Sequence, residues 1–270
     1  MTRHEDARPR EAFAAADFAA LGEHLWDPIG ADTTAAADPR PGQRVLDACC
    51  GTGASALPAA RLVGAEGVVD AVDVSASMVD ELRRRATGLP QLRTHRADVT
   101  TWDGTGYDVV QSALGIFFFP DMAAGTRRLI GMTRPGGRVV FTIWRAGAMA
   151  AAGEQLGRAV ADLTASTPRA REPHLFDRIN RPAPFAAWLA GLGMSEVDVA
   201  MREHSLPMTP ELAWLVVLGS GFRGALTGLD PEDVALVRDR YLGHLRAEGI
   251  DDLDATTLIA TGTAPRTTQP

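Results

Sequence analysis

The stretch VLDACCGTGASA, residues 45–56, passes from an apolar strand into a glycine-rich turn and then into small residues suited to a helix. We expect a strand over 44–49 and a helix over 53–64. Gly51, Thr52 and Gly53 bring nearly bare backbone to the carboxyl edge of the sheet, where open α/β folds bind ligands. The helix that follows offers its unpaired N–H groups to electron-rich atoms. The stretch therefore predicts a cofactor loop, and a tight turn without a ligand is the alternative.

Outward from this loop, short β-branched runs alternate with amphipathic stretches. They predict strands over 67–74, 92–98, 107–114 and 137–145, and a helix over 75–86 that Ser75 can cap. This alternation is typical of a parallel sheet with crossover helices, so we expect an α/β fold. Beyond residue 146 the chain becomes rich in Ala and Pro. There we expect a long strand over 195–208, helices over 210–222 and 231–247, and a final strand over 255–264.

The amino-acid composition excludes several classes of function. The 270 residues include 27 basic residues, all of them Arg, and 34 acidic residues, for a net charge of −7. The absence of Lys excludes Schiff-base and phosphate-loop lysine enzymes. An acidic chain repels phosphate backbones, so we expect a small-molecule partner and no nucleic acid. No membrane span or secretory signal is visible, which predicts a cytoplasmic protein. The adjacent Cys49 and Cys50 suit neither a disulfide framework nor a zinc site, so we expect free thiols and no metal.

Three acidic residues stand at or near the ends of successive predicted strands. Asp73 lies 20 residues beyond Gly53 and can accept two hydrogen bonds from a ribose diol, a geometry that serves NAD and S-adenosylmethionine equally. Asp47 lies inside an apolar strand, where a carboxylate is costly unless it is paired. A cationic amino-acid head group would pair with it and a pyrophosphate would be repelled. Asp98 can accept from an adenine amine or can cap the next turn.

In this order the segments VLDACCGTG, VDAVDVSASMVDEL, RADV and RLIGMTRPGGRVVFTIW resemble the class I S-adenosylmethionine-dependent methyltransferases. The resemblance covers residues 43–145 and is strongest to the ubiquinone/menaquinone-biosynthesis-like small-molecule branch. It implies a Rossmann-like seven-stranded sheet and S-adenosylmethionine as cofactor. It also implies that the loop lies against the methionine part, Asp73 at the ribose and Met78 at the adenine. Cys49 departs from the family, because many members carry the first glycine of DxGxGxG there. The cofactor residues predicted on all these grounds are Asp47, Cys49, Gly51, Thr52, Gly53, Asp73, Val74, Met78, Asp98, Val99, Gln111 and Ser112.

Large apolar side chains outside the core strands predict an apolar or aromatic acceptor. Residues 13–26 carry such side chains at helical spacing ahead of the first strand, as a lid over the cofactor or as ordinary core packing. Phe117, Phe118 and Phe119 follow the fourth strand, and three consecutive rings cannot all enter one core, so at least one should face the active cleft. The predicted acceptor-binding residues are Phe13, Phe18, Trp26, Phe117, Phe118, Trp144 and Phe176.

Methyl transfer needs alignment in a dry pocket more than side-chain chemistry. A hydroxyl or activated-carbon acceptor must still lose a proton, which makes a positioned base useful. His24, His174 and His204 are the candidates, because they lie in segments that the resemblance would place over the pocket. His95 and His244 read as structural residues.

Together these features predict a lid over 1–42, a cofactor-binding core over 43–145, a helical cap insertion over 146–194, strands returning to the core sheet over 195–265, and a tail over 266–270. The predicted function is transfer of a methyl group to a small acceptor resembling a specialised metabolite, polyketide or quinone, at O or C, with N also open. Two alternatives stay open. One is a methyltransferase-fold enzyme that uses the cofactor for cyclisation or rearrangement, and the other is an NAD(P)-dependent oxidoreductase. A homodimer is a further possibility.

Overall fold

The computed structural model describes residues 15–164 and 174–266. The chain divides into two compact units. The first, here called the sheet unit, consists of Trp26–Ala146, His174–Arg202 and Thr257–Pro270. The second, here called the helical unit, consists of Met1–Leu25, Gly147–Pro173 and Glu203–Thr256. The chain therefore crosses between the units several times, and each unit is described by itself.

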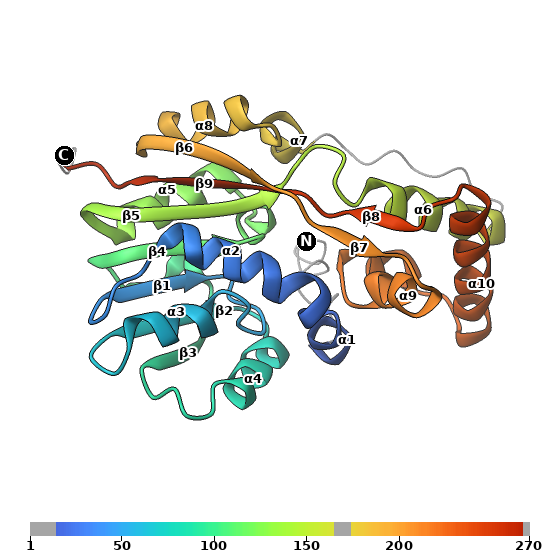
Figure 1. Cartoon of the computed structure of the whole chain (residues 1–270), viewed down its shortest axis with the longest axis horizontal. Helices are drawn as coiled ribbons and strands as arrows, with labels where there is room; N and C mark the ends of the chain where they lie inside the picture. Colours follow the sequence, from blue (N-terminus) through green and yellow to red (C-terminus); the bar gives the residue numbers. More distant parts are fainter. Residues whose placement is uncertain (1–14, 165–173, 267–270) are drawn as a thin grey trace, which may run out of the picture. The chain divides into compact units, whose positions relative to one another are not determined.

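The sheet unit is built on a seven-stranded sheet in the order β3-β2-β1-β4-β5-β9-β6 (Figure 1). Its strands are β1 (Arg44–Ala48), β2 (Val68–Asp73), β3 (Leu92–Arg96), β4 (Tyr107–Ala113), β5 (Thr133–Trp144), β6 (Ser195–Arg202) and β9 (Thr257–Thr263). The first five are parallel, and β9 runs antiparallel to β5 and β6. The prediction of a Rossmann-like seven-stranded α/β sheet is confirmed.

Strand order reverses direction at β1, which has β2 on one side and β4 on the other. This is the topological switch point at which open α/β sheets bind ligands, outside the carboxyl ends of the strands. The glycine-rich turn follows β1 directly. The site predicted from residues 45–56 therefore falls at the switch point.

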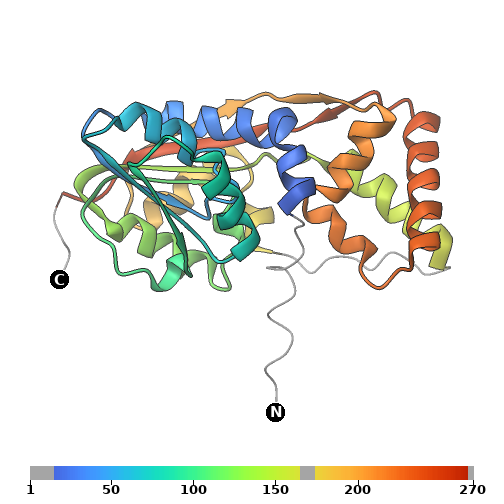
Figure 2. The same cartoon turned by 90° about the horizontal axis from the view of Figure 1, so that it is seen from below.

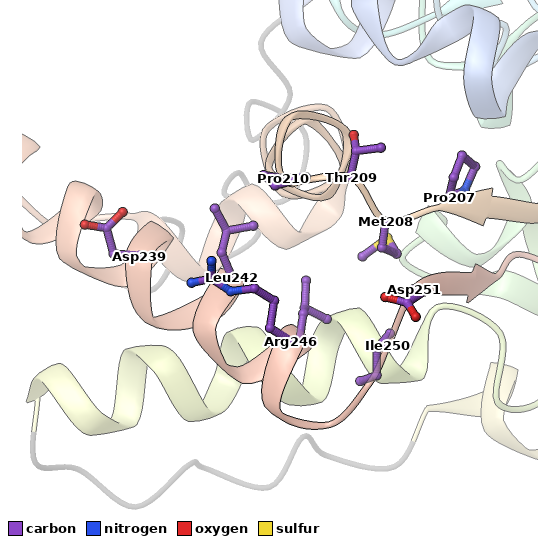
Figure 3. A pocket seen from close by; sticks show the side chains of 10 residues that line it. Pro207, Met208, Thr209, Pro210, Asp239, Leu242, Arg246, Ile250 and Asp251 are labelled. Carbon is purple, nitrogen blue, oxygen red and sulfur yellow. The ribbon is translucent and has the colours of Figure 1, made fainter.

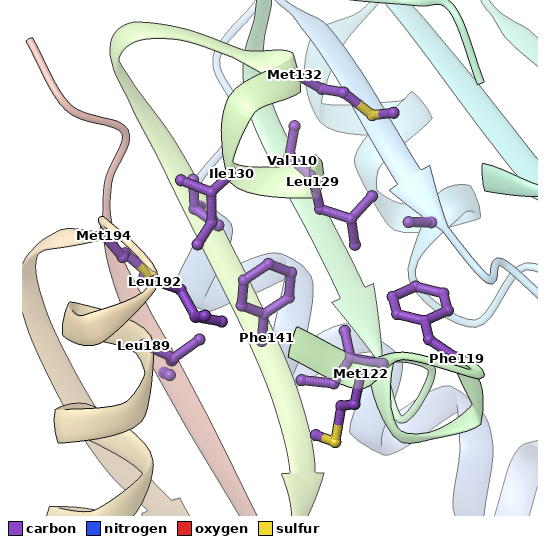
Figure 4. Close-up of a cluster of buried hydrophobic side chains, with 14 of the residues drawn as sticks. Val110, Phe119, Met122, Leu129, Ile130, Met132, Phe141, Leu189, Leu192 and Met194 are labelled. Carbon is purple, nitrogen blue, oxygen red and sulfur yellow. The ribbon is translucent and has the colours of Figure 1, made fainter. Parts of the chain in front are cut away.

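Both faces of the sheet are covered by helices, because successive side chains of each buried strand point to opposite faces (Figure 2). Val45, Val69 and Val109 pack on one face with residues of α2 (Asp27–Ala37) and α3 (Ala56–Val63). Leu46 and Val110 pack on the other face, in the cluster drawn in Figure 4, with residues of α5 (Met122–Met132) and α8 (Pro182–Gly191). The helix α4 (Ala76–Arg85) contacts β2 and β3, and Ser75 caps it as predicted.

The helical unit has its own core. It contains α1 (Ala15–Ala20), α6 (Ala150–Thr164), α9 (Pro210–Leu218), η4 (Gly221–Leu226), α10 (Pro231–Ala247) and a small sheet of β7 (Ser205–Pro207) with β8 (Asp252–Asp254). The segment η1 (Gly22–Trp26) carries the chain to the sheet unit. Leu156, Val217, Val237 and Tyr241 pack together between α6, α9 and α10. An ion pair between Arg223 and Asp17 at 2.6 Å joins η4 to α1.

The single strand predicted over 195–208 is wrong. It divides into β6, which pairs with β9, and β7, which pairs with β8 in the other unit. The break falls at Glu203 and His204, where the His204 carbonyl accepts from the Ala255 amide at 2.9 Å. Alternation along the sequence cannot reveal that a strand changes partners midway.

The structure also divides the chain differently from the predicted segments. Within 146–194, α6 belongs to the helical unit, whereas α7 (Leu175–Ile179) and α8 belong to the sheet unit. Phe185 and Leu189 of α8 are fully buried in the core below β6. Likewise, residues up to Leu25 belong to the helical unit and α2 packs on the sheet. In the part of the chain that is described, no helix is long and apolar enough to cross a membrane.

Candidate functional site

The glycine-rich turn takes backbone conformations that favour glycine. Gly51 and Gly53 have φ of 51° and 95°, and a Cβ on Gly53 would lie 2.3 Å from Cδ1 of Leu82 in α4. Cys49 also has a positive φ, 58°, at the position where the family pattern carries glycine. Its side chain lies against Gly115, whose added Cβ would be 2.5 Å from that of Cys49. The side chain of Cys49, where the family pattern has glycine, therefore fits because the facing residue, Gly115, has no side chain.

Asp47 is fully buried below this turn and has partners within the protein. Ser55 Oγ lies 2.9 and 3.0 Å from its two carboxylate oxygens and donates to them. The register pairs Asp47 with Gln111 of β4. Burial raises the pKa of Asp47 to about 7, although hydrogen bonds from Ser55 and Gln111 act in the opposite direction. The carboxyl group can therefore exchange its proton near neutral pH.

Asp73 ends β2 and binds the turn directly. Its Oδ2 accepts from the Gly51 amide and its Oδ1 from the Ser75 amide, both at 2.9 Å. Burial raises its pKa, against the effect of these backbone donors. Each carboxylate oxygen carries two lone pairs, so both retain capacity to accept from a ribose diol. That role stays a prediction.

The predicted cofactor residues gather at the carboxyl ends of β1 to β4. Asp98 caps η2 (Val99–Thr101), since its Oδ1 accepts from the Thr100 amide at 2.9 Å and hydroxyl at 2.6 Å. This is the capping role weighed as its alternative; contact with adenine stays a prediction. Met78 and Val99 are buried, and Val74 is exposed.

Two buried polar atoms of β4 have no hydrogen-bond partner within the described ranges: Gln111 Oε1 and Ser112 Oγ. Such atoms are costly to bury and suggest that a bound molecule completes their hydrogen bonding. Ser112 Oγ lies next to Gly115, whose added Cβ would come within 2.6 Å of it. These two residues fit a polar ligand beside the turn.

An aromatic group lies at the carboxyl ends of β4 and β5. Phe117 is 5.4 Å from Phe176 of α7 and 4.7 Å from Phe118, between ring centroids. Phe118 is 48% exposed, whereas Phe119 is buried in the core, so the three consecutive rings do separate as predicted. Trp144 ends β5 and lies 6.3 Å from Trp26 at the start of α2. The predicted acceptor residues of the sheet unit thus form two ring clusters on adjoining strands.

His174 has a defined hydrogen-bonding role. Its Nδ1 accepts from the Phe176 amide at 3.1 Å, and its own amide donates to Asp177 at 2.9 Å, which closes a capping box on α7. In the neutral imidazole the proton is therefore on Nε2. This geometry favours His174 as a hydrogen-bond donor and opposes its use as a base.

The remaining predicted residues lie elsewhere. His24 is exposed, and His204 and Phe18 are partly buried, all three in the helical unit. Phe13 lies outside the described residues. His95 bonds to Asp70 at 2.9 Å and His244 to Asp162 at 2.9 Å, in agreement with structural roles for both.

A cavity of about 570 Å³ lies in the helical unit (Figure 3). Met208, Leu242, Leu245 and Ile250 give it apolar walls, and Arg246 lies at it together with Asp239 and Asp251. None of the residues predicted for the cofactor or the acceptor lines it. Its lining suggests no chemistry for the predicted reaction.

Sequence reasoning missed the residues that support the turn from outside the motif. Thr34 Oγ1 donates to the Ser55 carbonyl at 2.9 Å, and Arg85 donates to both Thr52 and Asp27. A run of three arginines near the end of a helix, here Arg83 to Arg85, is typical of a solvated face, so the sequence gives no sign of this contact. Long-range contacts of this kind leave no local spacing signal.

Residues 45–137 match the family model described as a methyltransferase domain. This match identifies residues 45–137 as a methyltransferase domain, and the sheet order and the loop at the switch point agree with the class I S-adenosylmethionine-dependent methyltransferases that the motifs resemble. The prediction from the motifs is confirmed at this level, and S-adenosylmethionine is the cofactor of the class.

Relatives with known names are similar to this domain. Aklanonic acid methyltransferase DauC of Streptomyces sp. strain C5 is 34% identical over 133 residues, 47% of this chain and 60% of the relative. Nocamycin O-methyltransferase of Saccharothrix syringae is 32% identical over 129 residues, 46% of each chain. The chain thus matches only about half the length of these relatives. The solved YcgJ protein from Bacillus subtilis shares the fold, with a TM-score of 0.58 and 14% identity over 89% of this chain and 99% of that one.

Proposed function

We propose that this protein transfers a methyl group from S-adenosylmethionine to an apolar or aromatic small molecule, at oxygen or carbon. The observation that carries the proposal is that the carboxyl edge of the sheet has an acidic part and an aromatic part. Carboxylates occupy the ends of β1 and β2 and the turn after β3, and aromatic rings occupy the ends of β4 and β5. The first part suits a cationic nucleoside, and the second suits a flat apolar acceptor.

On the cofactor side, the donor set fits the proposed ligand. Asp73 is suited to the ribose hydroxyls, and Gln111 Oε1 and Ser112 Oγ offer acceptors beside the turn for the methionine part. Asp47 supplies negative charge below the turn, where an ammonium group would be attracted and a pyrophosphate repelled. The cofactor, when bound, supplies a methyl group on a positively charged sulfur.

On the acceptor side, the residues orient the molecule and exclude water. Phe117, Phe118 and Phe176 present ring faces and edges that suit an aromatic partner. His174 can donate from Nε2 to an acceptor oxygen. A dry, oriented contact provides most of the acceleration of a methyl displacement. The names of the two relatives, an aklanonic acid methyltransferase and a nocamycin O-methyltransferase, agree with a small organic acceptor.

The same proposal extends to the lid, to His24 and His204, and to the partners. We propose that the N-terminal residues act as a lid, that the protein acts in the cytoplasm without nucleic acid, and that it can form a homodimer.

Mass spectrometry of the purified protein for co-bound nucleosides, followed by calorimetry with S-adenosylmethionine and NADH, tests the cofactor. We expect S-adenosylmethionine to bind and NADH not to bind. Binding of NADH alone would favour the oxidoreductase and overturn the proposal. A screen of phenolic and quinone-like acceptors should then yield S-adenosylhomocysteine together with a methylated product. A converted acceptor without S-adenosylhomocysteine would favour the cyclisation alternative.

Two variants test the division of the edge. Asp73→Ala should weaken S-adenosylmethionine binding about tenfold or more, because hydrogen bonds to a charged group are lost.

Phe118→Ala should raise the KM for the acceptor and leave cofactor binding within about twofold, because this exposed ring packs little against the protein core. Calorimetry and steady-state kinetics measure both effects. The reverse order of effects would place Phe118 at the cofactor and contradict the division.

A further inference from the structure

Arg85, the last residue of α4, is bound to the cofactor turn and to α2 at the same time. Its Nη1 lies 3.1 Å from the Thr52 carbonyl and 3.3 Å from the Thr52 hydroxyl, and donates to them. Its Nη2 donates to Asp27 Oδ2 at 2.7 Å. The side chains of Arg85 and Asp27 are only 26% and 31% exposed. The guanidinium is therefore held by three oxygens from two separate segments.

The neighbouring arginines behave differently. Arg84 is 75% exposed and pairs with Glu81 one turn earlier in the same helix. Arg83 is 53% exposed and bonds to Asp80 and to Thr94 of β3. Among the described residues, the partners of Arg83 and Arg84 lie outside the turn, so the run of three arginines contains one residue with a distinct role.

One face of the helix α2 lies along the turn. Asp27 reaches Thr52 through Arg85, Gly30 lies against Ala54, and Thr34 bonds to the Ser55 carbonyl. Positions 27, 30 and 34 follow the spacing of one helix face. A Cβ on Gly30 would lie 2.3 Å from the Ala54 carbonyl carbon, which shows how closely the two backbones approach. The whole segment from Thr52 to Ser55 is thus supported by α2.

We propose that Arg85 and Asp27 form a positioning pair that holds the turn at residues 51–53 in its binding conformation, by fastening Thr52 to the first turn of α2. The inference rests on the proposed function, because the turn must bind S-adenosylmethionine for its conformation to matter. Neither residue touches reacting atoms. Their effect is on the position of the Gly51 and Gly53 backbone, which the pair fixes before the ligand arrives.

The pair also links the two parts of the site. Asp27 directly follows Trp26, whose ring lies 6.3 Å from that of Trp144 at the end of β5. The contact that fixes the turn therefore also fixes the start of α2, where the proposed acceptor side begins.

Arg85 and Asp27 do not contribute equally, so substitutions of the two residues should weaken cofactor binding to different extents. Within the described residues nothing donates to Asp27 Oδ1, a buried atom, and Arg85 is the cation that pairs with the other oxygen of this carboxylate. Removing Arg85 leaves an uncompensated charge beside the turn and frees the Thr52 carbonyl. Asp27→Asn leaves an oxygen that still accepts from Arg85. Loss of Arg85 should therefore have the larger effect.

Calorimetric titration with S-adenosylhomocysteine tests the pair in the full chain. We expect Arg85→Gln to raise the dissociation constant about tenfold and Asp27→Asn about threefold, with the double variant no weaker than Arg85→Gln alone. Arg85→Lys, which keeps the charge but cannot bridge both partners, should be intermediate. The adjacent Arg84→Gln is the matched control and should bind like the unaltered chain.

The outcomes separate the inference from the proposed function. If the unaltered chain binds neither S-adenosylmethionine nor S-adenosylhomocysteine, both fail. If it binds and Arg85→Gln binds equally well, the positioning pair is wrong and the proposed function stands. Should Arg85→Gln not fold, judged by its melting transition, Arg85→Lys and Asp27→Asn decide: unchanged affinity in both overturns the pair, and weakened affinity at unchanged melting temperature supports it.

Discussion

At the scale of single residues, Asp47 shows how a buried charge can serve binding at the expense of stability. It stands inside a strand whose other buried side chains are apolar, and Ser55 Oγ donates to its carboxylate oxygens. A carboxylate so placed is tolerated near neutral pH because the group can take up a proton. The polar network from Thr34 through Ser55 to Gln111 keeps it in place beside the turn.

The ionisation of Asp47 should make both the affinity for S-adenosylhomocysteine and the stability of the fold depend on pH. An ammonium group near Asp47 favours the charged form, so the affinity for S-adenosylhomocysteine should rise as the pH increases from 6 to 8. The folded pKa of about 7 lies above the unfolded value of about 3.9. The folded state thus binds a proton that the unfolded chain lacks between about pH 4 and 7, and this contribution to stability is lost as the pH rises through 7.

Asp47→Asn should remove both effects. Relative to the unaltered chain, its free energy of unfolding should be higher at pH 8 than at pH 5 by about 3 kcal/mol, because the unaltered chain loses about 1.4 kcal/mol for each pH unit between 5 and 7. Its melting temperature should change in the same direction. Its dissociation constant for S-adenosylhomocysteine at pH 8 should rise about tenfold. Calorimetry and thermal melts at both pH values measure this, with the exposed Asp80→Asn as control. An equal difference in melting temperature at pH 5 and pH 8 would contradict a raised pKa.

At the scale of elements, α2 does more than cover the sheet. Sequence spacing assigned it to an N-terminal lid, but it packs on β4 and β5 and contacts the turn after β1 along one face. Its Thr33 hydroxyl lies 2.7 Å from that of Thr142 in β5, which fixes the helix to the sheet below. The close approach at Gly30 is possible because that residue has no side chain.

Gly30→Ala should therefore damage the site as well as the fold. The added methyl group meets backbone at Ala54, which cannot rotate away, so we expect a loss of about 1–3 kcal/mol in unfolding free energy. Cofactor binding should weaken in parallel, because the turn must shift. Gly131→Ala in α5 is the matched control, since a Cβ there meets nothing within 4 Å. Denaturant melts and calorimetry compare the two. Equal effects from both variants would show that helix propensity, and not the contact with the turn, is responsible.

At the scale of the whole molecule, the chain builds two units from interleaved segments. The sheet unit contains the turn, the carboxylates and both ring clusters. The helical unit contains His24, His204 and Phe18, which the sequence analysis proposed for the acceptor. Ligand binding should therefore stabilise the first unit directly, and the second only if its residues contact the ligand.

Hydrogen exchange with and without S-adenosylhomocysteine tests this expectation. At a ligand concentration of about 100 times the dissociation constant, exchange through unfolding of the sheet unit should slow by up to about 100-fold. Peptides covering 47–55 and 73–78 should show it first, and α10 serves as the internal reference. Slowed exchange in α1 and η1 as well would support the proposed lid. Protection confined to the helical unit would contradict the placement of the cofactor site.

The sequence alone determined the α/β class, the turn at residues 51–53 and the methyltransferase domain, because each depends on patterns local to a few strands and loops. Periodicity is set within an element, and Gly51 and Gly53 carry the conformational freedom of the turn in their own backbone. Only the tertiary structure decided which outlying residues support that turn. Thr34 and Arg85 bond to residues of the turn segment that lie 21 and 33 positions away, and Gly115 faces Cys49 across 66 positions. It also decided where the strand after Ser195 changes sheets, since pairing partners and long-range hydrogen bonds depend on how distant segments meet in space.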